Sequence, residues 1–252
     1  MDLRVALFDY TLRLADNALI LGQRLGEWCG HGPILEQDIA MTNLALDLVG
    51  QARLLYQYAG TLEQKGRSED DLAYLRDSWD FRNVLLVEQP NTDFAYTVVR
   101  QFIFDSVDYC FYEALQHSND ATLAAIAEKS LKETRYHLRW SSEWVIRLGD
   151  GTETSRQKMQ QAVDDLWPYS GELLTMNETD RIMLDFGIGV DLEAIAPAVK
   201  ECQQSIMAEA NLKIPSDVFM HQGGKNGLHT EHLGYILAEL QFLQRTYPHA
   251  TW

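Results

Sequence analysis

Histidines and carboxylates at helical spacing are the residues of this sequence that could hold a redox metal. A diiron centre in a helical bundle takes a Glu from each of two helices and a Glu-x-x-His motif from each of two others. A spacing of three places both ligands of the motif on one helix face. None of the 7 histidines has Glu or Asp three positions before it. The sequence therefore contains no Glu-x-x-His motif, and we expect no metal bound in that way.

Carboxylates still stand where two of those motifs would lie. Asp47 is followed three residues on by Gly50, and Glu133 is followed by Tyr136. Carboxylates that share a low-dielectric centre need cations or protons to offset their repulsion. We therefore expect a vestigial polar centre that binds no metal. Its expected members are Asp47, Asp105, Glu133, Tyr136 and His137.

Two other interpretations of these carboxylates stay open. They could lie on solvated helix faces, or pair with basic neighbours such as Arg53, Arg135 and Arg139 in an ion-pair network. They could also ligate iron, because Glu133 and His137 stand four apart and so share a helix face. One such pair is too few for a dinuclear centre.

The segment Gly223 to His232, GGKNGLHTEH, is also rich in chemically active side chains. It does not fit the P-loop pattern, because Phe219 stands where the first Gly would be and Asn226 follows Lys225. A metal site at its two histidines is the less favoured alternative. We expect a glycine loop, with Thr230 as the N-cap of the helix that follows.

Helices must position these residues, because apolar side chains recur at spacings of three and four along most of the chain. Four long segments form two pairs, at about Leu3–Trp28, Glu36–Gln64, Thr92–His117 and Ala121–Leu148. Shorter helices are expected at about Ser155–Leu174, Asp191–Asn211 and Thr230–Thr246. A long connection between the pairs is typical of ferritin-like proteins. We therefore predict an all-α fold with a ferritin-like four-helix bundle core and additional C-terminal helices, in a single domain over residues 1–252.

The second long segment has apolar residues on two sides. One row contains Ile39, Leu46, Val49 and Tyr56, and the other contains Leu44, Leu48, Ala52 and Leu55. This pattern predicts a helix packed between neighbours. In the connection that follows, Val84 to Val87 has the composition of a strand. Because no second strand exists to pair with it, we expect a packed loop or a short helix there.

The composition excludes several function classes. With 21 Lys and Arg against 37 Asp and Glu, the formal charge is -16, so most of the surface would repel nucleic acid or an anionic membrane. No segment is apolar enough to span a bilayer, and the N-terminus has no secretory signal pattern. The 3 cysteines form no CxxC pair and suit a reducing compartment. We expect a cytoplasmic protein without a nucleic-acid or membrane partner.

Five stretches of the sequence carry a resemblance to a known family. They are LRLADNALILGQRLGEWCGHGPILEQDIAMTNLALDLVGQAR (Leu12 to Arg53), LLVEQPN (Leu85 to Asn91), KETRYHLRWS (Lys132 to Ser141), QKMQQA (Gln157 to Ala162) and GGKNGLHTEHLGYILAELQFLQR (Gly223 to Arg245). They span nearly the whole chain and resemble the C subunits of bacterial 1,2-phenylacetyl-CoA epoxidases, the multicomponent phenylacetyl-CoA monooxygenases of aerobic phenylacetate breakdown.

The resemblance implies a ferritin-like protein that is homologous to the catalytic A subunit but has a degenerate metal centre. In this family the A subunit carries the diiron site and binds the CoA thioester, and the C subunit is its structural partner in a heterotetramer. A small B subunit and a flavin, iron–sulfur reductase complete the complex, which epoxidises the ring with O2 and NADPH. The pairs Asp47/Gly50 and Glu133/Tyr136 then correspond to the decayed motifs.

We therefore expect a noncatalytic scaffold subunit that has no cofactor of its own, because oxygen activation needs a redox metal or an organic cofactor. One alternative is an active diiron carboxylate oxidase with unusual ligands such as Asp47, Asp105, Glu133 and His137. Another is a free-standing binding module whose acidic surface recognises a basic partner.

Overall fold

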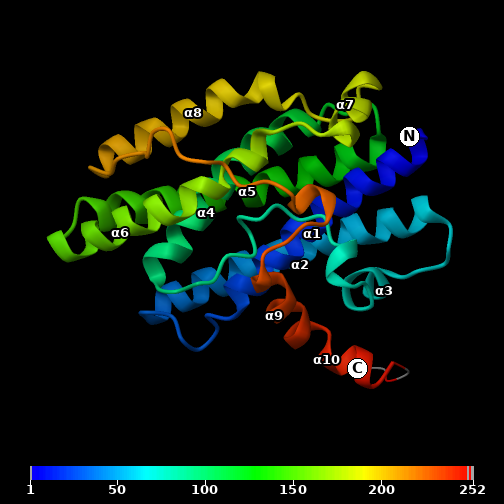
Figure 1. The fold of residues 1–252 in the computed structure, drawn as a ribbon, viewed down its shortest axis with the longest axis horizontal. Helices are drawn as coiled ribbons and strands as arrows, with labels where there is room; N and C mark the ends of the chain where they lie inside the picture. The colour runs from blue at the N-terminus through cyan, green and yellow to red at the C-terminus, as the bar shows by residue number, and fades with distance from the viewer. Residues whose placement is uncertain (1, 249, 251–252) are drawn as a thin grey trace. The chain divides into compact units, whose positions relative to one another are not determined.

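Helices and turns make up the computed structural model, which describes residues 2–248 and 250 (Figure 1). Its α-helices are α1 Leu3–Gly26, α2 Leu35–Glu63, α3 Glu69–Tyr74, α4 Phe94–Leu115, α5 Ala121–Gly149, α6 Glu153–Leu166, α7 Glu178–Asp185, α8 Leu192–Glu209, α9 Glu231–Leu240 and α10 Phe242–Thr246. Its 3-10 helices are η1 Ser78–Asp80, η2 Trp167–Tyr169, η3 Gly171–Leu174 and η4 Gly224–Asn226. The described residues contain no strand, and the expected all-α, ferritin-like class is confirmed.

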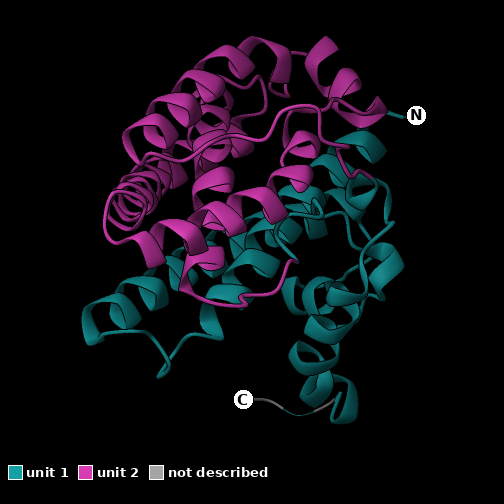
Figure 2. Cartoon of the chain, turned by 60° about the vertical axis from the view of Figure 1, so that its left-hand side comes forward, with its two compact units in different colours: residues 1–88, 223–252 teal, residues 89–222 magenta. Residues whose placement is uncertain are grey.

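The chain divides into two compact units, which Figure 2 distinguishes by colour. Unit 1 comprises residues 1–88 and 223–252, and unit 2 comprises residues 89–222. The single-domain assignment over residues 1–252 stays a prediction. Its range also includes residues 1, 249, 251 and 252, which lie outside the described residues. Within the described part of the chain, no helix is both long and apolar enough to cross a membrane.

In unit 1, α1 and α2 pack along their length as a helical hairpin (Figure 1). The inner apolar row of α2 is buried, as the sequence pattern predicts. Gly22 marks a close approach between the two helices. A Cβ added there would lie 3.2 Å from the Cβ of Leu48 and 3.3 Å from the carbonyl oxygen of Ala45. A glycine at this position therefore lets the two helices approach closely.

The connection after α2 is a packed loop with short helices, as expected. Val84 to Val87 form a buried turn and no strand. The backbone N–H of Val84 donates to the Asn17 side chain of α1 at 2.8 Å, which fixes this turn to the first helix.

The C-terminal segment returns to the same connection. Gly223, with a φ of 138°, and Gly227, with a φ of 81°, adopt backbone conformations that favour glycine. A Cβ added at Gly224 would lie 2.1 Å from the carbonyl oxygen of Asn83. The glycine loop expected from the sequence therefore lets the returning backbone lie directly on the connection.

Unit 2 is built on the pair α4 and α5, which pack against each other, with α6 and α8 against α4. Asp93, Asp120 and Asp191 cap the N-termini of α4, α5 and α8 by accepting backbone N–H groups. Both long pairs predicted from periodicity are therefore present.

Two of the predicted helices differ in extent from the sequence-based expectation. The helix expected at Ser155–Leu174 ends at Leu166 and continues as η2 and η3, because Pro168 cannot extend an α-helix. The helix expected at Thr230–Thr246 is divided at Gln241 into α9 and α10. In addition, α7 was not predicted.

Candidate functional site: two buried carboxylate centres

In unit 2, Asp105 forms the first buried carboxylate centre. Its side chain is 1% exposed and lies between α4 and α5. The Oδ1 atom accepts a hydrogen bond from Gln101 Nε2 at 2.7 Å, and Oδ2 accepts one from Ser141 Oγ at 2.8 Å. Gln101 precedes Asp105 by one turn of α4, and Ser141 follows the buried His137 by one turn of α5.

The ionisation of Asp105 depends on this environment. Burial raises the pKa of Asp105 from 3.8 to about 6, although the neighbouring His137 and the hydrogen bonds from Ser141 and Gln101 act in the opposite direction. The pKa of Asp108 is also raised, by burial and by the charge of Asp105. Neither of these hydrogen bonds to Asp105 comes from an Arg or Lys side chain. The negative charge of Asp105 is therefore offset by two neutral donors and by His137.

The structure brings together only some members of the expected vestigial centre. Asp105 and His137 interact inside unit 2. Glu133 is half-buried one turn before His137, and Tyr136 is 43% exposed with its ring centroid 6.4 Å from that of His137. Asp47 is half-buried on α2 and belongs to unit 1. The vestigial centre as a whole therefore stays a prediction.

Two of the arginines considered as partners of these carboxylates form ion pairs with other residues. Arg53 contacts Glu69 at 3.4 Å, and Arg139 contacts Glu143 at 3.4 Å. Both guanidinium groups are largely exposed. They therefore contribute no buried cation to Asp105.

A diiron group does not fit the residues around Asp105. Both carboxylate oxygens already accept hydrogen bonds from side chains. His137 supplies the one imidazole near Asp105 whose nitrogen could ligate a metal, among the contacts described above. Among the described residues, no three His, Cys, Asp or Glu side chains are grouped closely enough to hold a metal ion. Dinuclear carboxylate centres need several more ligands than this pair supplies.

In unit 1, Asp16 of α1 forms a second buried carboxylate centre, which the sequence analysis missed. Its side chain is fully buried. The guanidinium of Arg76 donates to both oxygens, with Nη1 3.1 Å from Oδ2 and Nη2 bonded to Oδ1. Tyr56 Oη donates to Oδ1 at 2.6 Å, and the backbone N–H of Arg82 donates to Oδ2 at 2.8 Å. These four donors give both carboxylate oxygens hydrogen-bond partners inside the protein.

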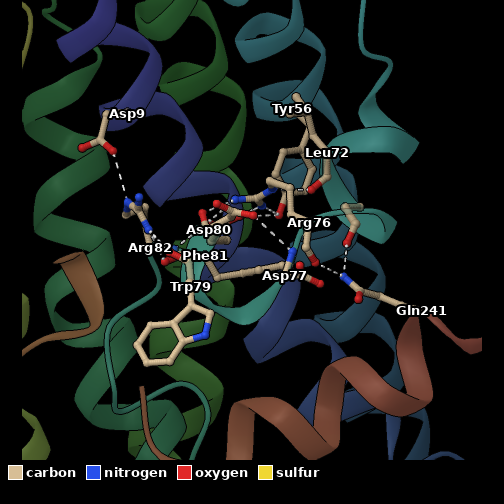
Figure 3. A network of polar contacts seen from close by, with 12 residues as sticks. Asp9, Tyr56, Leu72, Arg76, Asp77, Trp79, Asp80, Phe81, Arg82 and Gln241 are labelled. Carbon is tan, nitrogen blue, oxygen red and sulfur yellow. Dashed lines mark hydrogen bonds and ion pairs between the residues drawn. The ribbon is translucent and has the colours of Figure 1, made fainter. Parts of the chain in front are cut away.

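Arg76 lies in the connection between α3 and η1, and contacts with η1 and with the residue that follows it hold the side chain in place (Figure 3). Arg76 Nη1 also donates to the carbonyl oxygen of Asp80 at 2.8 Å, and its Cζ lies 4.1 Å from the centroid of the Phe81 ring. Burial opposes the charge of Arg76, but Asp16, Tyr56 and Asp80 together outweigh burial and raise the pKa of Arg76. Burial, and then Asp16, raises the pKa of Tyr56 well above its ordinary value. Asp16 and Arg76 therefore form a buried ion pair.

Glu88 is another buried carboxylate of unit 1. It lies in the connection after α2 and contacts the residues that follow the glycine loop. Its Oε1 accepts the backbone N–H of Thr230 at 2.6 Å, and its Oε2 lies 3.0 Å from His229 Nδ1 and 3.0 Å from Asn83 Nδ2. The other ring nitrogen, Nε2 of His229, lies 3.0 Å from the carbonyl oxygen of Phe81. Both ring nitrogens face acceptors, so both must donate, and only the imidazolium form does so.

The pKa of His229 is consistent with this arrangement. Burial alone would lower the pKa of His229, but the hydrogen bond and charge of Glu88 raise it above 6.5.

Thr230 stands at the N-cap of α9, as expected from the sequence, but its side chain makes no capping hydrogen bond. The carboxylate of Glu88 instead accepts the N–H of Thr230. His229 therefore anchors the C-terminal segment.

Comparisons with known proteins agree with the resemblance found in the sequence. A family model described as "Phenylacetic acid catabolic protein" matches residues 2–252. The C subunit of the 1,2-phenylacetyl-CoA epoxidase of Escherichia coli (strain K12) is 49% identical over 243 residues, which cover 96% of this chain and 98% of that relative. The match therefore includes the sequence of both compact units.

Proposed function

Because the chain belongs to the phenylacetic acid catabolic protein family, we propose that it acts in phenylacetate catabolism as a noncatalytic subunit of a 1,2-phenylacetyl-CoA epoxidase. Its role in that complex is to bind and stabilise the diiron A subunit, which epoxidises the ring of phenylacetyl-CoA with O2 and electrons from NADPH. The relative that it matches over nearly its whole length is itself named as a subunit of this epoxidase.

The environment of Asp105 is the observation that carries the noncatalytic role. A carboxylate that ligates iron offers its oxygens to the metal, whereas Asp105 offers Oδ1 to Gln101 and Oδ2 to Ser141. Asp105 and His137 then have a structural role between α4 and α5.

The proposed assembly is the one that the resemblance implies. This chain and the A subunit form a heterotetramer, and the small B subunit and the flavin, iron–sulfur reductase join them in the complete complex. We also propose a cytoplasmic location. The free thiols of Cys29, Cys110 and Cys202 support it, because such thiols persist in reducing compartments.

Iron analysis of separated and combined subunits tests this function. The chain is purified alone, and together with the A subunit, and the iron content and ring epoxidation of each preparation are measured. We expect the chain alone to bind substoichiometric iron and to have no activity, and the two chains to co-elute. In the complex, Asp105→Asn is expected to leave turnover within about twofold of the wild type, since the proposal gives this residue no contact with substrate.

Two results would contradict the proposal. One is near-stoichiometric iron on the isolated chain that is lost when Glu133 and His137 are replaced by Ala, which would support an active diiron oxidase. The other is a chain that does not co-elute with the A subunit at micromolar concentration, which would support a free-standing binding module.

A further inference from the structure

Asn226 and Gly227, in the glycine loop of unit 1, form a pair of residues that is prone to a spontaneous covalent change. The backbone nitrogen of the residue after an asparagine can attack the side-chain amide of that asparagine. Glycine permits this attack best, because it has no Cβ to obstruct it and adopts backbone conformations that other residues avoid. The sequence contains 8 asparagines, and Asn226 is the one that Gly follows. Its neighbour therefore gives Asn226 the least steric protection.

The structure leaves Asn226 open to water. It is the last residue of η4 and is exposed, whereas the adjacent Lys225 and Gly227 are buried. Attack on the amide releases ammonia, and water must then reach the product. An exposed side chain meets both requirements.

The reaction balances without an oxidant or a cofactor. The nitrogen of Gly227 bonds to Cγ of Asn226, the bond between Cγ and the amide nitrogen breaks, and ammonia leaves with the proton that Gly227 has lost. The cyclic imide that forms then takes up one water molecule. Opening at one carbonyl gives Asp. Opening at the other gives isoaspartate, in which the main chain runs through the former side chain and is longer by one carbon atom.

Hydrogen bonds of the folded loop restrain this reaction. The N–H of Gly227 donates to the carbonyl oxygen of Gly224 at 2.9 Å. The N–H groups of Asn226 and Leu228 both donate to the carbonyl oxygen of Gly223 at 2.9 Å. The nitrogen of Gly227 must leave its acceptor before it can lose a proton and attack. The reaction therefore proceeds from molecules whose loop has opened, and its rate follows their fraction.

The contacts of His229 oppose this opening, because they hold the chain directly after the loop. Its Nδ1 lies 3.0 Å from Glu88 Oε2, and its Nε2 lies 3.0 Å from the carbonyl oxygen of Phe81. We call these two contacts the His229 anchor. Loss of the anchor is expected to increase the fraction of open loops.

The folded loop has no room for the longer main chain of isoaspartate. A Cβ added at Gly227 would lie 2.6 Å from the carbonyl oxygen of Trp79, and one added at Gly224 would lie 2.1 Å from that of Asn83. The backbone on both sides of Asn226 therefore lies directly against the connection after α2. An additional carbon atom in the main chain between the two glycines must displace one of them.

We propose that Asn226 is a site of spontaneous deamidation, and that the isoaspartate formed there releases the C-terminal segment from the connection after α2. Displacement of the loop breaks the His229 anchor, and α9, which begins at Glu231, then loses its attachment at its N-terminal end. This inference concerns the covalent ageing of the chain and does not depend on the proposed function.

Peptide mass spectrometry of the full chain tests the modification. The wild type is kept at neutral pH and body temperature for several days, and samples are digested at mildly acidic pH, which suppresses the reaction during handling. Asn226 is expected to lose its amide at least about tenfold faster than Asn211, an exposed asparagine that Leu212 follows. Asn226→Gln is expected to retain its amide, because the larger ring that Gln must form closes more slowly. Equal rates at Asn226 and Asn211 would overturn the assignment.

Two further rates test the control by the folded loop. In guanidinium chloride, where the chain is unfolded, Asn226 is expected to react at least about tenfold faster than in the folded chain. His229→Gln is expected to raise the rate in the folded chain about threefold or more, because the anchor is lost. His31→Gln is the control and is expected to leave the rate unchanged, because His31 is exposed and lies outside the anchor. A rate that His229→Gln does not change would contradict the role of the anchor.

Hydrogen exchange of fresh and aged chains tests the release of the C-terminal segment. The amides of α9 are expected to exchange at least about tenfold faster in aged wild type, and those of α4 to keep their rate. Aged Asn226→Gln is expected to match fresh wild type. Fresh Asn226→Asp, which adds the charge without the longer main chain, is expected to match it too. Unchanged exchange in a chain that contains isoaspartate would overturn the proposed release, and so would fast exchange in fresh Asn226→Asp.

Discussion

Asp16 in unit 1 and Asp105 in unit 2 are both fully buried carboxylates, but the protein satisfies them in different ways. Asp16 receives a guanidinium, a phenol and a backbone N–H. Asp105 receives an amide and a hydroxyl, with His137 nearby. The first carboxylate is compensated by a permanent cation, whereas the second is compensated by neutral donors and a titratable group. Burial alone therefore does not determine what a carboxylate does for the fold.

The difference has a thermodynamic meaning. An ion pair in a protein interior depends on both partners, because removal of one leaves the other charge buried and uncompensated. A buried carboxylate with a raised pKa can instead take up a proton. We therefore expect unit 1 to depend strongly on Asp16 and unit 2 to tolerate the neutralisation of Asp105.

The largest expected effect is that of Asp16→Asn. It leaves the guanidinium of Arg76, whose side chain is 3% exposed, without its counter-ion. We expect the free energy of unfolding to fall by about 3–5 kcal/mol at neutral pH, measured by urea denaturation. Asp9→Asn is the control, because Asp9 contacts Arg82 at 3.4 Å near the surface, and a loss of less than ~1 kcal/mol is expected. A loss of that small size for Asp16→Asn would show that the ion pair is unimportant.

Asp105→Asn is expected to raise the free energy of unfolding at high pH, whereas Asp16→Asn lowers it. The pKa of Asp105 is about 6 in the folded chain against 3.8 for an ordinary Asp, so the folded state holds the additional proton between these values. The stability of the wild type therefore falls as the pH rises from about 4 to about 6. The variant lacks this slope, and at pH 8 it is expected to be more stable by up to about 3 kcal/mol.

Thermal or urea unfolding of the wild type and Asp105→Asn at several pH values measures this difference. Gln101 can rotate its amide to present its oxygen to the amide introduced at position 105, which keeps the hydrogen bonds satisfied. Parallel pH profiles for the two proteins would contradict the assigned cause.

His229→Gln is expected to have a smaller effect, again with a defined pH dependence. The pKa of His229 is raised in the folded chain, so its ion pair with Glu88 contributes stability below about pH 6.5 and this contribution is lost as the pH rises through the raised pKa. We expect the variant to lose about 1–2 kcal/mol at pH 6 and less at pH 9. Hydrogen exchange of the C-terminal segment at the two pH values measures this loss of stability. His31→Gln is the control, because His31 is exposed. An equal loss at both pH values would exclude the ion pair as the cause.

The smallest expected effect is that of Ser141→Ala. The hydroxyl of Ser141 donates to Asp105 Oδ2 at 2.8 Å and so helps to hold the pKa of Asp105 down. Its removal is expected to raise the pKa of Asp105 above about 6 and to cost about 1 kcal/mol at pH 8. Carboxyl titration by NMR measures the pKa, and an unchanged value would contradict this role.

Most of the helical framework could be predicted from the sequence, because its long helices carry continuous apolar rows. The predicted end of α1 at Trp28 and of α5 at Leu148 lie close to the observed ends at Gly26 and Gly149. The short helix α7 was missed because it offers few apolar turns to detect. Its capping box, formed by Asn177 and Asp180, was the available signal.

The two carboxylate centres differ in how far the sequence could indicate them. Asp105 and His137 lie on long helices that were predicted as parts of a bundle, so their meeting could be expected. Asp16 could not be identified in this way. Its partners Arg76 and Arg82 are 60 and 66 residues further along the chain, in an irregular connection that shows no helical period. Only the tertiary fold brings those groups to α1.

The return of the C-terminal segment to unit 1 also determines when this unit can be completed during protein synthesis. Glu88 is made early, but its partner His229 follows 141 residues later. At ~5–20 residues per second, a ribosome needs roughly 7–30 s to make the intervening chain. During that interval α1, α2 and the connection after them lack the contacts of the C-terminal segment, so unit 1 is completed only after the sequence of unit 2 has been made.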